Sequence, residues 1–156
     1  MFFKLYGEER SLRSSPLKLR DNDLKNYLNP NMTDKLQELS ALSLAHIGDA
    51  VFELMVRTHL CMDGTRLVDK LHKRSVEYVS AKSQASAADA LLQVLCDEEK
   101  EVFKRGRNSH TGQIPKNSTR EQYHAATGLE ALFGYLYLSG NIKRLNELFE
   151  VVIRKD

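Results

Sequence analysis

Cysteines are scarce in this sequence, and their scarcity excludes one kind of metal site. Cys61 and Cys96 are the only cysteines in 156 residues, and neither has Cys or His partners at the spacing of zinc ligands. We therefore expect no zinc site. A disulfide is possible from the count alone, but two buried thiols are the better expectation for a protein of the reducing cytosol.

Long apolar runs are also missing. No segment approaches the ~20 apolar residues that a transmembrane helix needs. Lys4, Glu8 and Glu9 interrupt the apolar start of the chain, which argues against a secretory signal peptide. We therefore expect a cytoplasmic protein with no membrane partner. At 156 residues the chain is most naturally one domain with a sizeable core.

Net charge is low as well, since 23 basic and 21 acidic residues leave a formal charge of only +2. Composition therefore does not indicate a nucleic-acid-binding protein, but the distribution of charge does. Between residues 102 and 120 there is no Asp or Glu, and the basic residues of this segment are Lys104, Arg105, Arg107, Lys116 and Arg120. Because local charge sets the electrostatic footprint of a protein, this segment is a candidate surface for a polyanion.

Helical periodicity dominates the sequence after residue 40. Apolar spacing and end signals predict helices over residues 40–60, 66–73, 76–95, 98–104, 121–138 and 142–153. Asp97 is expected to cap the fourth of these helices and Gly106 to end it. Gly128 and Gly134 are costly inside a helix and indicate close helix packing. No strand pattern is comparably strong, so we predict an all-α domain over residues 36–156 after an N-terminal extension over residues 1–35.

Two acidic residues interrupt apolar helical patterns far apart in the chain. Asp49 follows Gly48, and Glu130 lies between Leu129 and Ala131. A carboxylate in such a setting is costly to bury unless it is paired or binds a cation. If the two converge, they form an oxygen site suited to Mg²⁺. Taken singly, each is equally well explained as a solvent-facing or ion-paired helical residue.

Several segments, in this order, resemble the catalytic domain of ribonuclease III, and most closely its minimal branch, Mini-ribonuclease III. The segments are residues 45–53, 69–75, 79–85, 104–108, 115–117 and 127–136. The resemblance covers roughly residues 39–152. It implies an all-α homodimer that cleaves both strands of double-stranded RNA with Mg²⁺, and it makes Asp49 and Glu130 the catalytic and metal-binding residues.

The same resemblance carries expectations about substrate and domain content. The minimal branch is associated with maturing the ends of large-subunit (23S) ribosomal RNA precursors. It lacks the C-terminal double-stranded-RNA-binding domain of larger relatives, and this chain likewise ends after its last predicted helix. We therefore expect the catalytic domain to contact RNA by itself.

One departure from the larger enzymes affects the mechanism. They carry a carboxylate four residues before the position of Asp49 and another three before that of Glu130, where this chain has Ala45 and Thr127. Two carboxylates suffice for one Mg²⁺, which keeps several waters, but they make a two-metal clamp held only by protein doubtful. The alternative is a non-catalytic RNA-binding or ribosome-associated module on the same fold. A helical interaction protein without RNA affinity is the third hypothesis.

Basic residues supply the expected RNA contacts. The resemblance favours phosphate contacts from one set near the end of the helix over residues 98–104 and from a second set further upstream. The first set is Lys104, Arg105, Arg107, Lys116 and Asn117, and the second is Lys73, Arg74 and Lys82. Without the resemblance, the same charges would be interpreted as a solvated helix end and ordinary helix surface.

Overall fold

The fold is helical throughout the part of the chain that the computed structural model describes, residues 25–109, 114 and 116–154. Its elements are η2 (Thr33–Glu38), α1 (Ala41–Met62), α2 (Val68–Val79), α3 (Ala81–Leu91), α4 (Asp97–Arg107), α5 (Arg120–Leu138) and α6 (Ile142–Ile153). No strand occurs among these residues, so the predicted all-α class is confirmed. None of the described helices combines the length and hydropathy needed to cross a membrane.

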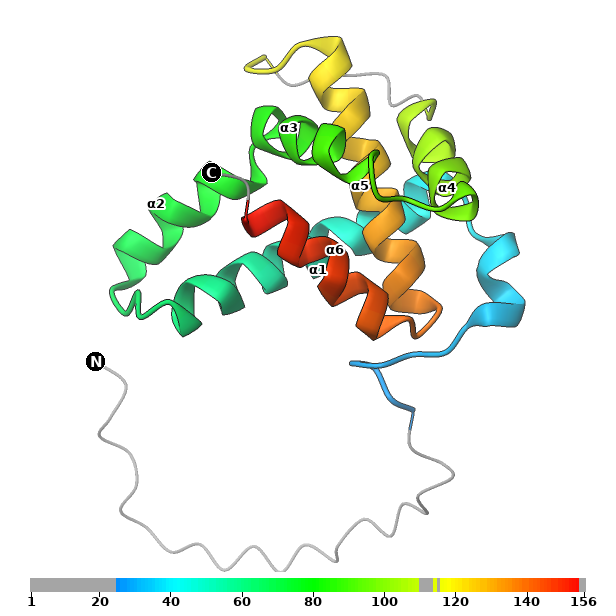
Figure 1. Ribbon diagram of the computed structural model, residues 1–156, viewed down its shortest axis with the longest axis horizontal. Coiled ribbons are helices and arrows are strands. Elements are labelled where there is room, and N and C mark those ends of the chain that lie inside the picture. The colour runs from blue at the N-terminus through cyan, green and yellow to red at the C-terminus, as the bar shows by residue number, and fades with distance from the viewer. Residues whose placement is uncertain (1–24, 110–113, 115, 155–156) are drawn as a thin grey trace, which may run out of the picture.

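Helix α5 forms the centre of the molecule. It crosses α1, while α3, α4 and α6 lie around it (Figure 1). The Phe52 ring on α1 packs edge-to-face against Phe133 of α5 and Phe149 of α6, with ring centroids 5.2 and 6.0 Å apart. All three rings are buried, and such contacts add to the free energy of burying them. The core therefore fixes α1 and α5 relative to each other.

Several helix boundaries differ from the sequence prediction, among them the end of α3 at Leu91 instead of residue 95. The break in the second helical region lies at Ser80 rather than near residue 75, because Ser80 has extended backbone angles and its hydroxyl accepts a hydrogen bond from the Ser83 N–H at 3.3 Å. Helix α4 begins after Cys96 rather than at an Asp97 cap, and the Cys96 N–H donates to the Glu99 carboxylate at 3.0 Å.

The expected end of α4 at Gly106 is also wrong. Helix α4 continues through Gly106 to Arg107. The residue lies against α5, where an added Cβ would be 2.5 Å from the Ala131 side chain and 2.9 Å from the Thr127 carbonyl oxygen. Gly106 therefore serves helix packing instead of helix termination.

The expectation of buried thiols is wrong for both cysteines. Cys61 and Cys96 are free, but each is exposed. Cys61 lies in the last turn of α1, and Cys96 is the N-cap of α4. Both lie at helix ends, where side chains leave the core.

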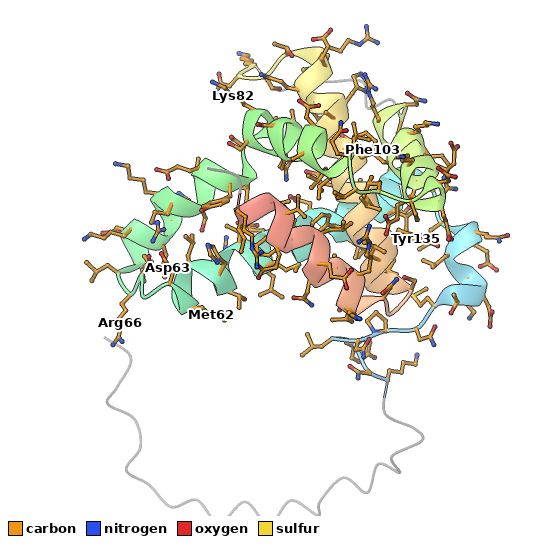
Figure 2. All side chains as sticks on the ribbon, in the orientation of Figure 1. Met62, Asp63, Arg66, Lys82, Phe103 and Tyr135 are labelled. Atoms are coloured by element: carbon orange, nitrogen blue, oxygen red, sulfur yellow. The ribbon has the colours of Figure 1, made fainter. Side chains whose placement is uncertain are left out.

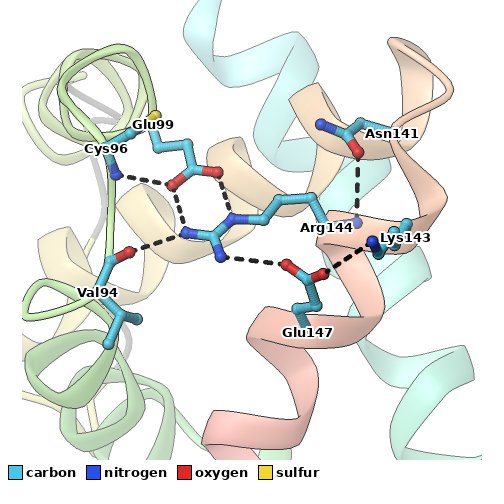
Figure 3. Close-up of polar contacts among 7 residues, drawn as sticks. All are labelled: Val94, Cys96, Glu99, Asn141, Lys143, Arg144 and Glu147. Carbon is cyan, nitrogen blue, oxygen red and sulfur yellow. Dashed lines mark hydrogen bonds and ion pairs between the residues drawn. The ribbon is translucent and has the colours of Figure 1, made fainter.

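A bidentate ion pair joins α6 to the start of α4. Arg144 donates to both carboxylate oxygens of Glu99, at 2.7 and 3.0 Å, and to the Val94 carbonyl at 2.8 Å (Figure 3). The Glu99 side chain is only 7% exposed. Its hydrogen bonds from Arg144 lower the pKa of Glu99 despite this burial. Breaking such a pair leaves a buried charge uncompensated, so Arg144 stabilises this end of the bundle.

The predicted boundary at residue 35 falls within η2. The Met32 N–H donates to the Leu138 carbonyl at 2.8 Å, and Leu36 is buried against the end of α5. Residues 1–24 of the predicted extension lie outside the described residues. The division into an extension and a catalytic domain therefore stays a prediction.

Candidate active site

Asp49 and Glu130 are brought together where α1 crosses α5. A Cβ added to Gly48 would lie 1.7 Å from the Glu130 carbonyl oxygen, a distance that no real side chain tolerates. Only a residue without Cβ lets the two backbones approach this closely. Because Asp49 directly follows Gly48, the crossing places its carboxyl near that of Glu130. The convergence predicted from sequence therefore has a backbone cause.

The two carboxyl groups lie close enough to repel each other. Partial burial raises the pKa of Glu130 to about 7, and repulsion from Asp49 contributes to this rise. Loss of solvent also raises the pKa of Asp49, and repulsion from Glu53 adds to it. Asp49 is nevertheless exposed as a residue, so its carboxyl borders protein on one side and solvent on the other. A cation bound here would offset the repulsion and remain accessible to substrate.

The donor set fits a hard divalent cation held largely by water. Among the described residues, no group of three or more His, Cys, Asp or Glu side chains could hold a metal ion. Two carboxylates suit Mg²⁺, which binds through one or two such groups and keeps several waters. They do not suit zinc, which takes three or four protein ligands.

Both positions at which larger relatives have extra carboxylates are buried. Ala45 on α1 and Thr127 on α5 are each 5% exposed. The Thr127 hydroxyl donates to the Tyr123 carbonyl at 3.0 Å, one turn earlier in the helix. Neither residue adds a metal ligand in this arrangement. Glu53 is paired with Arg57 along α1, as its spacing predicts.

Gln84 lies beside Glu130, whereas the sequence predicts it as a neighbour of Lys82 that reaches RNA 2′-hydroxyls, an expectation that its burial shows to be wrong. Helix α3 packs against α5, and Gln84 is 2% exposed. Its side-chain amide lies near enough to Glu130 to lower the pKa of that carboxyl, although burial and Asp49 outweigh the effect. The available signal was one amide within the small-residue run over residues 81–88, which helix periodicity alone does not mark as functional.

Three residues of the first basic set lie on α4, which packs against the helix that carries Glu130. Lys104, Arg105 and Arg107 are exposed in the last turn of α4. Gly106, among them, packs against α5 at Thr127, one turn before Glu130. Phe103, on the preceding turn, also packs on this part of α5 (Figure 2). The packing of α4 therefore fixes this cationic helix end against residues 127–131 of α5.

A cavity of about 370 Å³ continues this surface towards α5. It is lined by Arg107, Asn108, Arg120, Glu121 and His124. A ring nitrogen of His124, Nδ1, lies 2.7 Å from the Arg107 carbonyl oxygen and ties the two helices together. From sequence, Arg120 was counted in the basic segment over residues 102–120 but was not among the predicted RNA-binding residues, and His124 was assigned no role. Their spacing of one helical turn places both on the same side of α5, which single-residue reasoning overlooked.

The remaining predicted RNA-binding residues are distributed differently. Lys116 and Asn117 are exposed in the segment before α5, and Lys73 is exposed on α2. Lys82 lies at the start of α3 (Figure 2). It lines a cavity together with Ser83 and Ser86. Arg74 instead donates to Asp63 at 3.1 Å and to Thr65, which ties α2 to the end of α1. The structure thus places the α4 members of the first set on a helix that packs against α5, places Lys116 and Asn117 in the segment before α5, and gives Arg74 a structural contact.

Substituting Glu130 by Gln is expected to stabilise the metal-free protein above neutral pH. The unfolded carboxyl ionises near pH 4.5, whereas the folded group ionises at about 7. Between these values the unfolded chain releases its proton first, so the free energy of unfolding falls by about 3 kcal/mol as the pH rises. Denaturant unfolding in EDTA should show Glu130→Gln more stable at pH 8 and no advantage at pH 4. An advantage independent of pH would contradict this origin.

Known proteins with similar sequences and structures share one family. The Ribonuclease III domain family matches residues 42–141. The Mini-ribonuclease 3 of Thermoanaerobacter sp. (strain X514) is 43% identical over 74% of this chain and 82% of its own length. The Mini-ribonuclease 3 of Synechocystis sp. is 44% identical over 80% of this chain and 85% of its own length. A crystal structure of a Fusobacterium nucleatum protein, 31% identical, covers 77% of this chain and 96% of its own with a TM-score of 0.69. The chain therefore belongs to the ribonuclease III family of endoribonucleases, among the Mini-ribonucleases 3.

Proposed function

We propose that this protein is a Mg²⁺-dependent endoribonuclease that cleaves double-stranded RNA as a homodimer in the cytoplasm, with large-subunit (23S) ribosomal RNA precursors as its substrate. The observation that carries the proposal is the carboxyl pair Asp49 and Glu130, drawn together by a glycine crossing and mutually repulsive. The family supports the activity, whereas the ribosomal RNA substrate follows from the sequence resemblance.

Asp49 and Glu130 are the residues proposed to hold the ion through their carboxylate oxygens. When bound, Mg²⁺ supplies a water of lowered pKa and neutralises charge that develops on the scissile phosphate. Hydrolysis adds water across the phosphodiester and leaves a 5′-phosphate and a 3′-hydroxyl. Since each subunit has one such pair, a dimer is needed to cut both strands, and a monomer would only nick.

The direct test is cleavage of an end-labelled RNA duplex with Mg²⁺ and with EDTA. We expect double-strand cleavage only with Mg²⁺, and products that carry a 5′-phosphate. Binding of the duplex without cleavage, for both a generic duplex and a precursor RNA, would favour the alternative of a non-catalytic RNA-binding module.

An apolar groove on α1 supports the proposed dimer. The inner side of α1 is buried against the core, yet its outer side is also apolar. With the neighbouring segments it lines a groove of about 390 Å³, whose residues include Ile47, Val51, Leu54, Met55 and Tyr137. Leu54 is 58% exposed. A helix with apolar residues on both sides indicates a second packing partner.

Substituting Leu54 by Asp is expected to produce a monomer. A charge in the groove would be desolvated at an interface, which costs about 2 kcal/mol or more and weakens association at least thirtyfold. Sedimentation velocity measures the change. Leu67→Asp is the matched control, since Leu67 is 62% exposed outside the groove. Equal dissociation of both variants, or of neither, would contradict the assignment of this face. The monomer should nick duplex RNA instead of cutting both strands.

Removing charge at the end of α4 is expected to weaken duplex binding. If Arg105 and Arg107 contact phosphates, the double alanine variant should lose affinity and lower the slope of log affinity against log salt by about two. Filter binding at several salt concentrations provides the slope. Lys143→Ala with Arg154→Ala removes the same charge from α6 and should leave the slope unchanged. A uniform decrease in both double variants would indicate only a net-charge effect.

A further inference from the structure

The Gln84 amide is an unusual group within this fold. Its nitrogen, Nε2, is buried and makes no hydrogen bond to any described residue. A buried donor without an acceptor costs folding free energy, and native proteins rarely leave one unpaired. The residues around it on α3 are small or apolar, and Ala87, Ala88 and Leu91 belong to the core. A methionine would fill this place without the cost, so the amide needs a reason other than packing.

The hydrogen-bond acceptor that best suits this amide is the Glu130 carboxyl. Helix α3 packs along α5, and the Gln84 amide is near enough to Glu130 to favour its ionised form. The nitrogen and the carboxyl nevertheless do not make a hydrogen bond of standard geometry. A carboxylate that binds a cation with one oxygen keeps the other oxygen free to accept. The amide therefore faces a group that would need a donor when the cation is bound.

We propose that Gln84 is a positioning residue for the metal site: its Nε2 donates to one oxygen of Glu130 and thereby directs the other oxygen towards the cation. The inference deepens the proposed function and rests on its assignment of Glu130 as a metal ligand. Groups that orient metal ligands commonly contribute 10–100-fold to metal affinity or activity. Among the described residues, no buried side chain donates a hydrogen bond to Asp49. The positioning effect is therefore expected at Glu130 alone.

Gln84→Met in the full-length protein tests the proposal, because it keeps the volume and removes the amide. We expect Mn²⁺ affinity, followed by electron paramagnetic resonance without RNA, to fall about tenfold. The Tm should stay the same or rise, since an unpaired polar group has been removed. Leu91→Met changes another buried residue of α3 and should alter neither quantity. In the cleavage assay kcat at fixed Mg²⁺ should fall with KM for RNA unchanged.

A double variant identifies the route of the effect. If Gln84 acts through Glu130, adding Gln84→Met to Glu130→Gln should weaken Mn²⁺ binding no further. Additive losses would overturn the proposal, as would Mn²⁺ affinity within twofold of wild type in Gln84→Met. A lower Tm in both Gln84→Met and Gln84→Leu with Mn²⁺ affinity retained would show a packing role and also overturn it. If the wild type binds Mn²⁺ but cleaves no duplex, the proposed function fails while the Mn²⁺ comparison still decides the role of Gln84.

Discussion

Asp49→Asn should reduce the kcat for cleavage of double-stranded RNA on the order of a thousandfold, the scale of losing one preorganised charge-stabilising group. The substitution keeps the size of the side chain and removes its negative charge. One carboxylate, at Glu130, then remains to hold the cation beside the scissile phosphate. Duplex affinity measured without metal should be retained or slightly increased, because the variant repels phosphate less. The contrast between lost turnover and retained binding is the signature of a catalytic ligand.

Asp34→Asn is the matched control for this experiment. Asp34 is exposed on η2, away from the crossing of α1 and α5, so the same chemical change should leave kcat unaltered. Cleavage by Asp49→Asn within tenfold of wild type would place the active site elsewhere. The absence of cleavage in wild type and variant alike, with RNA binding in both, would instead identify the RNA-binding module.

The sequence was sufficient for the all-α class and for the approximate positions of the helices. Apolar spacing located α1, α5 and α6 to within two residues, because their buried faces follow the helical period. It misplaced the break at Ser80, because the apolar helical period continues on both sides of this residue. The break itself is made by a local serine cap, which the period does not reveal. It also assigned Gly106 to a helix end, since a glycine that ends a helix and one that permits close packing look alike in sequence.

The chemistry of the site depended on contacts that no sequence spacing contains. Asp49 and Glu130 were proposed as partners, but their repulsion and the elevated pKa of Glu130 follow from the tertiary crossing. Gln84 was assigned to RNA contact for the same reason: its sequence neighbours are polar, and only the packing of α3 on α5 buries it beside Glu130. Arg74 was assigned to RNA binding from its sequence neighbourhood, but in the fold it forms an ion pair with Asp63.

Gly48→Ala should destabilise the fold by about 4 kcal/mol, at the upper end of single substitutions. Helix propensity alone predicts that Gly48→Ala stabilises the fold, since alanine is favoured over glycine inside a helix by about 1 kcal/mol. The added Cβ would, however, lie 1.7 Å from the Glu130 carbonyl oxygen and 2.7 Å from the Gly134 nitrogen. Both are backbone atoms and cannot rotate away. Thermal unfolding should show a decrease in Tm of roughly 10 °C.

Gly64→Ala separates this clash from the general cost of replacing glycine. Gly64 has φ of 88° and open space around an added Cβ, so its substitution should cost only about 1 kcal/mol. A Tm for Gly48→Ala equal to wild type would show that the helices can separate without loss, which would contradict the fixed crossing.

Gly134 provides the reciprocal test, since a Cβ there would meet the Leu44 carbonyl oxygen at 2.0 Å. Both substitutions push apart the same pair of helices, so their combined cost should be less than the sum of the two. Because the same separation would move Asp49 away from Glu130, any folded Gly48→Ala protein should also bind Mn²⁺ more weakly. Stability and the proposed metal binding are therefore both expected to depend on the close approach of α1 and α5.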